Sequence, residues 1–333
     1  MRKNSLQQCL LAGALVLGAS PGMAAAQESS AIEVVSAIEE AFGVTPGQRR
    51  NHTKGTCAVG KFVGMPEAAA YSRSPLFSGR PLPVVARFSL AGGNPNAPDT
   101  AKNPRGMALE FRLPDGGLQH MTMLNTPLFG AARPATFLAQ MIALKQDPAT
   151  GKPDPAKLRA FRDSHPDNAS QAEFLATNNP PVSYANSAYF GIHTFKFIDR
   201  GNRTRLVRWR FVPQDGEQRL TDAALRTAPA NFLEPALIER TRHGPVRWDM
   251  VLTLGEPGDP ENDPTLAWPE GRKEVKAGTL TISSAMPQAG ASCEKINFDP
   301  LVMGDGIEPT DDPILLFRSP AYAVSFAKRI GGQ

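Results

Sequence analysis

Short alternating segments separated by glycine, proline and asparagine restrict the fold of this chain more than any other feature. Residues 83–89 (PVVARFS), 107–113 (MALEFRL) and 120–124 alternate in hydrophobicity as β-strands do. The pattern starts near Ala58, Gly60 and Phe62 and returns at 189–197, 205–211, 248–254, 278–283 and 293–298. Strong turn sequences such as Asp115-Gly116-Gly117 separate them. The pattern predicts an antiparallel sheet that closes, or nearly closes, into a barrel.

A helical pattern interrupts the strands between residues 134 and 178. RPATFLAQMIALK (133–145) places Phe137, Met141 and Leu144 on one side of a helix. PDPAKLRAFRD (153–163) and SQAEFLATN (170–178) are typical of two further short helices. The order of elements predicts an α+β fold, with an antiparallel β-barrel, a helical insertion and a C-terminal helix. There is no internal repeat and no long low-complexity linker, so we expect residues 27–333 to form one domain.

Residues 318–329 (RSPAYAVSFAKR) predict the C-terminal helix. On a helix, Arg318, Tyr322 and Arg329 share one stripe. A nearby guanidinium favours the phenolate form of a tyrosine, and tyrosinate is one of the known ligands of haem iron. Pro320 lacks an amide donor, so we expect the helix to kink or to begin there. Taken alone, this segment is more typical of a surface helix that buries one tyrosine.

Residues 1–26 have the features of a cleaved signal peptide. Arg2 and Lys3 precede a short apolar run, and Ala24-Ala25-Ala26 offers a cleavage site. Cys9 is not at a lipobox position, and no later run of about 18 apolar residues follows, so we expect a periplasmic or secreted protein without a membrane span. The net charge of the whole chain is only +4, which argues against nucleic-acid binding.

Two cysteines, Cys57 and Cys293, follow the signal sequence. An oxidising compartment permits their pairing. If the barrel closes its first strand on its last, the two lie on neighbouring strands at bonding distance; two separate buried thiols are the alternative. No HExxH, CxxC, Walker, Rossmann or GxSxG pattern is present, which argues against a zinc site, nucleotide binding or serine hydrolase chemistry.

Seven segments in order resemble the haem catalase family, in the form of a short, exported, catalase-related peroxidase. They are RRNHTKG (49–55), ARFS (86–89), APDTAKNPRG (97–106), NTPLF (125–129), FGIHTFKF (190–197), INFDP…GIEP (296–309) and RSPAYAVSFAKR (318–329). One such motif would be weak evidence, but seven in the same order span most of the chain.

The resemblance implies a haem, taken to be haem b, held inside the barrel. It places His52 above the iron as the acid–base group, with Ser89 bonded to it. It makes Tyr322 the iron ligand and Arg318 its cationic partner. The remaining cofactor-binding positions that it implies are Arg49, Arg87 and Arg329 at the propionates, and Phe129 and Phe137 beside the pocket.

One departure from the family pattern bears on activity. The family has an asparagine two residues before the Thr-Pro of the NTPLF segment, and this chain has Leu124 there. From the resemblance we also expect no counterpart of the long N-terminal arm, wrapping segment and C-terminal domain of large catalases. We therefore expect a monomer or small oligomer that reduces hydrogen peroxide or organic peroxides with a small organic donor, and that is a weak catalase.

Other readings remain open at this point. An exported haem carrier or sensor would keep Tyr322 and the propionate arginines but would not need His52 with Ser89. A hydroperoxide-rearranging enzyme resembling allene oxide synthases would keep the fold, although nothing in the sequence marks a long lipid channel. A secreted barrel without a cofactor is the plainest possibility.

Overall fold

The computed structural model describes residues 29–333. The predicted signal peptide, residues 1–26, lies outside the described residues. Among the helices of residues 29–333, none is long and apolar enough to cross a bilayer.

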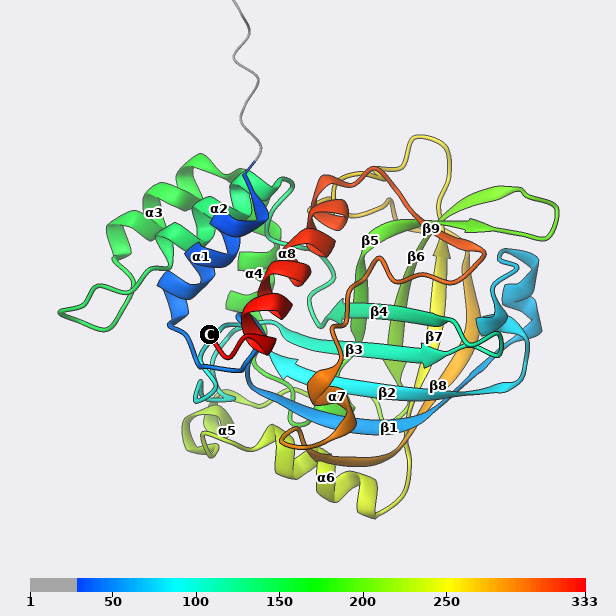
Figure 1. Cartoon of the computed structure of the whole chain (residues 1–333), viewed down its shortest axis with the longest axis horizontal. Helices are drawn as coiled ribbons and strands as arrows, with labels where there is room; N and C mark the ends of the chain where they lie inside the picture. The colour runs from blue at the N-terminus through cyan, green and yellow to red at the C-terminus, as the bar shows by residue number, and fades with distance from the viewer. Residues whose placement is uncertain (1–28) are drawn as a thin grey trace, which may run out of the picture.

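Eight antiparallel strands close into a barrel, which confirms the predicted fold class (Figure 1). Neighbours in sequence pair within two groups, β1 pairs with β8, and the β4–β5 pairing closes the ring. The strands are β1 (Gly55–Gly64), β2 (Pro81–Leu90), β3 (Arg105–Arg112), β4 (Leu118–Leu124), β5 (Tyr189–Ile198), β6 (Thr204–Pro213), β7 (Val246–Leu254) and β8 (Glu274–Pro287). A short strand, β9 (Ile307–Pro309), pairs with β5.

Aromatic side chains fill the barrel, so the expectation of a haem inside it is wrong. Phe62 lies against Phe111 with ring centroids 5.4 Å apart, and Phe88 stacks on Trp248 at 5.7 Å. All four rings are fully buried. Because side chains alternate along a strand, the neighbours of Phe88, Arg87 and Ser89, point to the outer face. Any large ligand at those residues must therefore lie outside the barrel.

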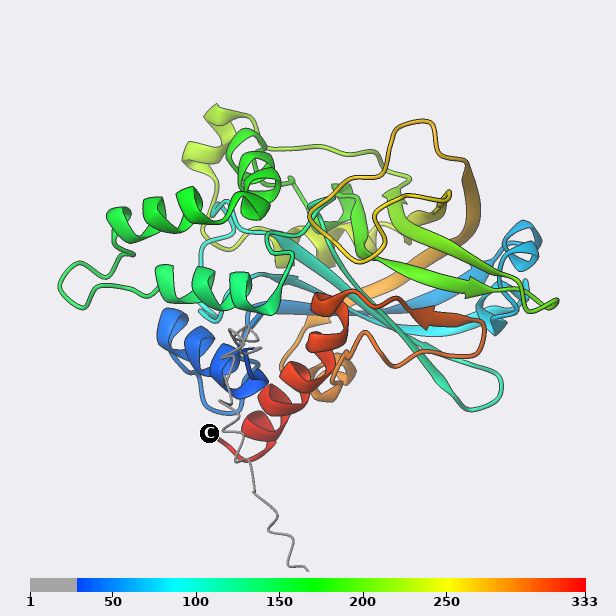
Figure 2. The ribbon, with the colours of Figure 1, turned by 90° about the horizontal axis from the view of Figure 1, so that it is seen from above.

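Helices from three parts of the chain gather at one side of the barrel (Figures 1 and 2). They are α1 (Ala31–Phe42), α2 (Pro134–Ala143), α3 (Pro155–Ser164), α4 (Ala169–Thr177) and α8 (Pro313–Ile330). The insertion α2–α4 confirms the predicted helical pattern. α1 was not predicted, although Ser30 and Glu33 form a capping box at its start. It packs against both α2 and α8, and so joins the insertion to the C-terminal helix.

The remaining helices are short. α5 (Asp222–Thr227) and α6 (Leu233–Arg242) lie between β6 and β7, where no helix was predicted, and α7 (Ser292–Lys295) follows β8. Four 3₁₀ helices are described in residues 29–333: η1 (Pro66–Ala70), η2 (Pro75–Phe77), η3 (Pro166–Asn168) and η4 (Tyr184–Asn186).

Helix α8 begins earlier than the sequence suggested. Asp312 is its N-cap, with Oδ1 accepting from the amides of Ile314 and Leu315, and Pro313 occupies the first turn. Pro320 lies inside the helix on its exposed side. Of the two expectations, a kink or a start at Pro320, the start is wrong, because the cap fixes the start about two turns upstream. Water can reach the carbonyl that Pro320 leaves unbonded.

Cys57 and Cys293 form a disulfide, with their Cα atoms 5.6 Å apart. The pairing confirms the prediction, but the expected strand at 293–298 is wrong. Cys293 belongs to α7, because β8 already occupies the place beside β1 and the chain turns back after Pro287. The bridge therefore fastens α7 to the barrel wall.

Replacing both cysteines should destabilise the fold. The bridge closes a loop across a sequence separation of 236 residues, and its loss should lower the free energy of unfolding by about 2–5 kcal/mol. Urea denaturation of the Cys57→Ala/Cys293→Ala variant beside the wild type measures this. On the unfolded, unreduced protein without residues 1–26, thiol titration should find no free thiol, and two thiols per chain would show that the bridge is absent.

Candidate functional site

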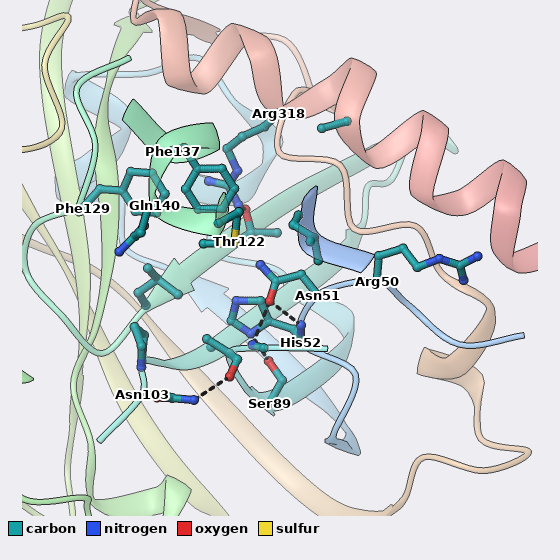
Figure 3. A pocket seen from close by; sticks show the side chains of 18 of the residues that line it. Arg50, Asn51, His52, Ser89, Asn103, Thr122, Phe129, Phe137, Gln140 and Arg318 are labelled. Atoms are coloured by element: carbon teal, nitrogen blue, oxygen red, sulfur yellow. Dashed lines mark hydrogen bonds between the residues drawn. The ribbon is translucent and has the colours of Figure 1, made fainter. Parts of the chain in front are cut away.

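A cavity of about 600 Å³ lies between the outer face of the barrel and the surrounding helices (Figure 3). Strands β2, β3 and β4 form one wall, and α1, α2 and α8 contribute to the others. Each site residue predicted from the sequence lines it: Arg49, His52, Arg87, Ser89, Phe129, Phe137, Arg318, Tyr322 and Arg329. The fold thus brings together residues that lie up to 280 positions apart in the printed sequence.

His52 is held rigidly in the cavity wall. Its Nδ1 lies 2.9 Å from Ser89 Oγ. Its backbone has φ 54°, a left-handed conformation that is uncommon for a residue other than glycine. The Asn51 side chain supports this conformation, since its Oδ1 accepts from the amides of His52 and Gly92 at 2.8 Å each. The bond to Ser89 leaves Nε2 of the imidazole as the ring atom available for chemistry.

The surroundings keep His52 neutral. Removal from water, reinforced by the positive charges of Arg87, Arg318 and Arg49, lowers the pKa of His52 to about 3. Gly106 leaves the space that the ring occupies, because a Cβ there would lie 2.7 Å from Ser89 Oγ and 3.1 Å from the imidazole. The glycine of the NPRG segment is therefore required by the packing of His52.

Three arginines surround one end of the cavity and bond mainly to neutral groups. Arg49 donates to the carbonyls of Cys293 and Ile296 at 3.1 and 2.5 Å. Arg329 donates to the carbonyls of Glu294 and Lys295 at 3.0 and 3.2 Å. These four carbonyls belong to α7 and the residue after it, where a helix end leaves carbonyls without partners.

Arg87, the third of these arginines, is buried and holds the segment that carries His52. It donates to the carbonyls of His52 and Thr53 at 2.8 and 3.1 Å, and to Gln288 Oε1 at 2.7 Å. Burial lowers the pKa of Arg87 to about 10. Arg87 thus links the barrel wall to the segment that carries His52.

The three guanidiniums have no carboxylate within ion-pair distance among residues 29–333. Burial, then repulsion from Arg87 and Arg329, lowers the pKa of Arg49 to about 8, and attraction to Glu294 does not cancel this. Buried cations without counter-ions are costly. The cluster therefore fits a bound dianion, and the two propionates of a haem meet that requirement.

A connected network of polar side chains joins helix α8 to strands β4 and β5. Arg318 donates to Tyr322 Oη at 3.2 Å and to Thr122 Oγ1 at 2.6 Å, and its Nη1 lies 3.1 Å from His193 Nε2. On the far side of that ring, His193 Nδ1 lies 2.7 Å from Asp312 Oδ2. Asp312 is also the N-cap of α8, so the element that carries Tyr322 and the chain that orients Arg318 share one residue.

The protonation states of His193 and Asp312 follow from their surroundings. Burial lowers the pKa of His193 and outweighs the attraction of Asp312. Burial opposes the ionisation of Asp312, but the hydrogen bonds from His193 and from the amides of Leu315 and Ile314 lower its pKa overall. A neutral His193 then donates from Nδ1 to Asp312 and accepts from Arg318 at Nε2. His193, Asp312 and Thr122 were not predicted from the sequence as site residues; the FGIHTFKF segment was a signal for the first.

Two aromatic rings complete the cavity. Phe129 and Phe137 stack with centroids 5.8 Å apart, and Figure 3 shows them together at one side. Leu124, the residue at the asparagine position, also lines the cavity. The site thus offers apolar surface for a flat ring, cations for two carboxylates, and a histidine and a tyrosine on different walls.

A β-barrel with such a cavity on its outer face is suited to bind a large, flat, anionic cofactor. The chain belongs to the catalase family: the family model "Catalase" matches residues 22–333. Members of this family are haem proteins.

Individual relatives agree with this membership. The chain is 64% identical over 300 residues to the catalase-related peroxidase of Synechococcus elongatus, covering 90% of this chain and 88% of that one. It is 33% identical to the catalase-related peroxidase of Mycolicibacterium paratuberculosis, covering 90% and 94%. The Schizosaccharomyces pombe catalase is 30% identical, but only 59% of its length is covered.

Solved structures support the same fold. A bacterial catalase superposes with a TM-score of 0.79 at 25% identity, covering 86% of this chain and 58% of that one. A fungal catalase gives a TM-score of 0.80 at 22% identity, covering 86% and 60%.

Acidification should destabilise the protein through His52. The pKa of His52 is lower in the folded state than its usual value near 6.5, so the unfolded chain binds the proton first and stability falls as the pH drops below 6.5. Between pH 7 and 5 this one group should cost about 2 kcal/mol. Urea denaturation at both pH values should show a smaller drop for His52→Asn, a residue that tolerates positive φ.

The matched control is His243→Asn, because the His243 side chain is 74% exposed. This variant should show the same drop as the wild type. Equal drops in wild type and His52→Asn would mean that His52 does not titrate on unfolding.

Proposed function

We propose that the protein is a haem peroxidase that reduces hydrogen peroxide or organic peroxides with electrons from an organic donor, and that it is a weak catalase. The observation that carries this proposal is the placement of His52–Ser89 and Arg318–Tyr322 on different walls of one cavity, at an arginine cluster that fits two propionates. The name of the Synechococcus elongatus relative, catalase-related peroxidase, supports the same assignment.

Tyr322 would hold the iron from the side of α8. The hydrogen bond from Arg318 withdraws negative charge from the phenolic oxygen, and the neutral His193 keeps the arginine in place. When bound, the haem would supply the redox chemistry that moves two electrons from the donor to the peroxide. Arg49, Arg87 and Arg329 would meet its propionates, and Phe129 and Phe137 would pack against the ring.

His52 would move the proton. We call the peroxide oxygen nearer the haem the inner oxygen and the other one the outer oxygen. Because the His52 imidazole is neutral, Nε2 can accept the proton from the inner oxygen and return it to the outer oxygen as the O–O bond breaks. The outer oxygen leaves as water, or as an alcohol when the peroxide is organic, and the inner oxygen leaves as water with the two electrons and two protons that the donor gives up. Ser89 fixes the ring in the orientation that this transfer needs, through its bond to Nδ1.

The pairing of His52 with Ser89 favours an enzyme over the alternatives. A haem carrier or sensor needs a cation cluster and an iron ligand but has no use for a neutral histidine fixed by Ser89. We propose haem b as the cofactor, a small organic molecule as the donor, and a monomer or small oligomer as the assembly. We also propose export to the periplasm or medium, in keeping with the Cys57–Cys293 bridge, since such bonds persist in oxidising compartments.

Tyr322→Phe should weaken haem binding, because it removes the oxygen that would ligate iron while keeping the ring. Haem content of the purified variant and transfer of haem to an acceptor protein measure the loss. Val324→Ala on the same helix, at a residue that does not line the cavity, is the control for general damage to α8. If Tyr322→Phe keeps its haem with an unchanged absorption spectrum, another residue holds the iron.

His52→Asn should retain haem but reduce peroxide turnover. A positioned acid–base group typically contributes about 10²–10⁴-fold, so the rate of peroxide reduction should fall by that factor. Stopped-flow absorption with limiting peroxide gives the rate. An unchanged rate would remove His52 from the mechanism.

The ratio of oxygen release to donor oxidation tests the function itself. Wild-type protein loaded with haem should oxidise an organic donor readily and release little oxygen from hydrogen peroxide. Leu124→Asn should raise oxygen release relative to donor oxidation. No donor oxidation by the wild type would reject the peroxidase assignment, and an unchanged ratio in Leu124→Asn would show that residue 124 does not limit catalase activity.

A further inference from the structure

The cavity wall contains amide side chains that the proposed mechanism does not use. Apart from Asn51, already described as the support of His52, those that line it are Asn103, Gln140, Asn168, Gln171 and Asn297. An amide has four hydrogen-bonding positions, and one left unbonded in an apolar wall is costly. Whether each amide is already engaged therefore shows which of them is available to a substrate.

Three of the five are committed to the protein. Asn103 Nδ2 donates to the carbonyl of Ala91 at 3.2 Å. Asn168 Nδ2 donates to the carbonyl of Gly130 at 2.8 Å. Gln171 Nε2 donates to Thr126 Oγ1 and to the carbonyl of Leu128 at 3.0 and 3.1 Å. These amides hold loops in place and cannot turn toward a ligand without breaking those bonds.

Two amides, Asn297 and Gln140, make no side-chain hydrogen bond within residues 29–333. Asn297 lies between Ile296, whose carbonyl binds Arg49, and Phe298, whose ring lies 6.0 Å below the Arg49 guanidinium. It therefore belongs to the arginine end of the cavity, where the propionates would be.

Gln140 lies in a different part of the wall. It is one turn after Phe137 on α2, and it is partly buried. Figure 3 shows Gln140 beside Phe129 and Phe137, across the cavity from His52 and Ser89. Leu124, which also lines the cavity, offers no polar group, so among the amides that line the cavity Gln140 is the one that can face a substrate at this side.

We propose that the Gln140 amide donates a hydrogen bond to the outer oxygen of the peroxide, and so supplies from helix α2 the amide that strand β4 lacks at Leu124. The proposal rests on the proposed function, because it needs a peroxide between His52 and Gln140. It assigns a substrate-binding role to a residue that no sequence motif marks. A side chain on a helix, with three rotatable bonds, can also withdraw to admit a peroxide with a bulky organic group.

The test uses haem-loaded protein and cyanide, a small anion that would occupy the space between His52 and Gln140 without turnover. Gln140→Leu keeps the side-chain size and removes the amide. Loss of one hydrogen bond should raise the cyanide dissociation constant about 2- to 12-fold. It should also shift the infrared stretching frequency of the bound cyanide. Gln146→Leu, the same change at an exposed residue just after α2, should do neither.

A second variant tests whether the amide, rather than the shape of the wall, is responsible. Adding Leu124→Asn to Gln140→Leu should restore cyanide affinity toward the wild-type value, because it returns an amide to the wall of the cavity, now on strand β4. Thermal unfolding and haem content should be equal in all variants. If Gln140→Leu and Gln146→Leu give the same affinity and frequency while the wild type binds cyanide and turns over peroxide, the role of Gln140 is rejected and the proposed function stands. A wild type without peroxide turnover would reject the proposed function itself.

Discussion

A cluster of three arginines removed from water without a carboxylate partner is the constraint on which the rest of the site depends. Burial, reinforced by the charge of Arg329, lowers the pKa of both Arg49 and Arg87, and no carboxylate in residues 29–333 pairs with the three guanidiniums. The fold instead offers the carbonyls of α7, which can accept hydrogen bonds without cancelling the charge needed for a dianion. The Cys57–Cys293 bridge fastens this short helix to β1, so the covalent link supports the cation cluster as well as the barrel.

One carboxylate on α1 joins the two sides of the site. Glu39, in the last turn of α1, accepts from Arg50 Nε at 2.5 Å and from Lys328 Nζ at 2.6 Å. Arg50 lies two residues before His52, and Lys328 lies six residues after Tyr322. The segment with the acid–base group and the helix with the tyrosine are thus joined through α1. Both contacts are largely shielded, so they should resist screening by salt better than surface pairs.

The barrel and the helical insertion could be predicted from the sequence because alternating and 3.6-residue patterns report burial on one face. The position of the site could not. Both faces of β2 are buried near Ser89, one against the barrel core and one against the cavity, so alternation does not tell inside from outside. α7 is too short for any period to appear, and its cysteine was compatible with a strand. Gln140 and Asp312 belong to no spacing pattern, and only their surroundings in space give them meaning.

Some residues that carry the family resemblance stabilise the fold and do not touch the substrate. Lys54, in the segment with His52, pairs with Asp99 at 2.7 Å. Asp99 in turn accepts from the amides of Phe232 and Leu233 at the start of α6. The matched motifs therefore argue for the fold at least as strongly as for the chemistry. What distinguishes one member of such a family from another must lie in the remaining wall of the cavity, and here that wall combines an apolar Leu124 with an uncommitted amide on the facing helix.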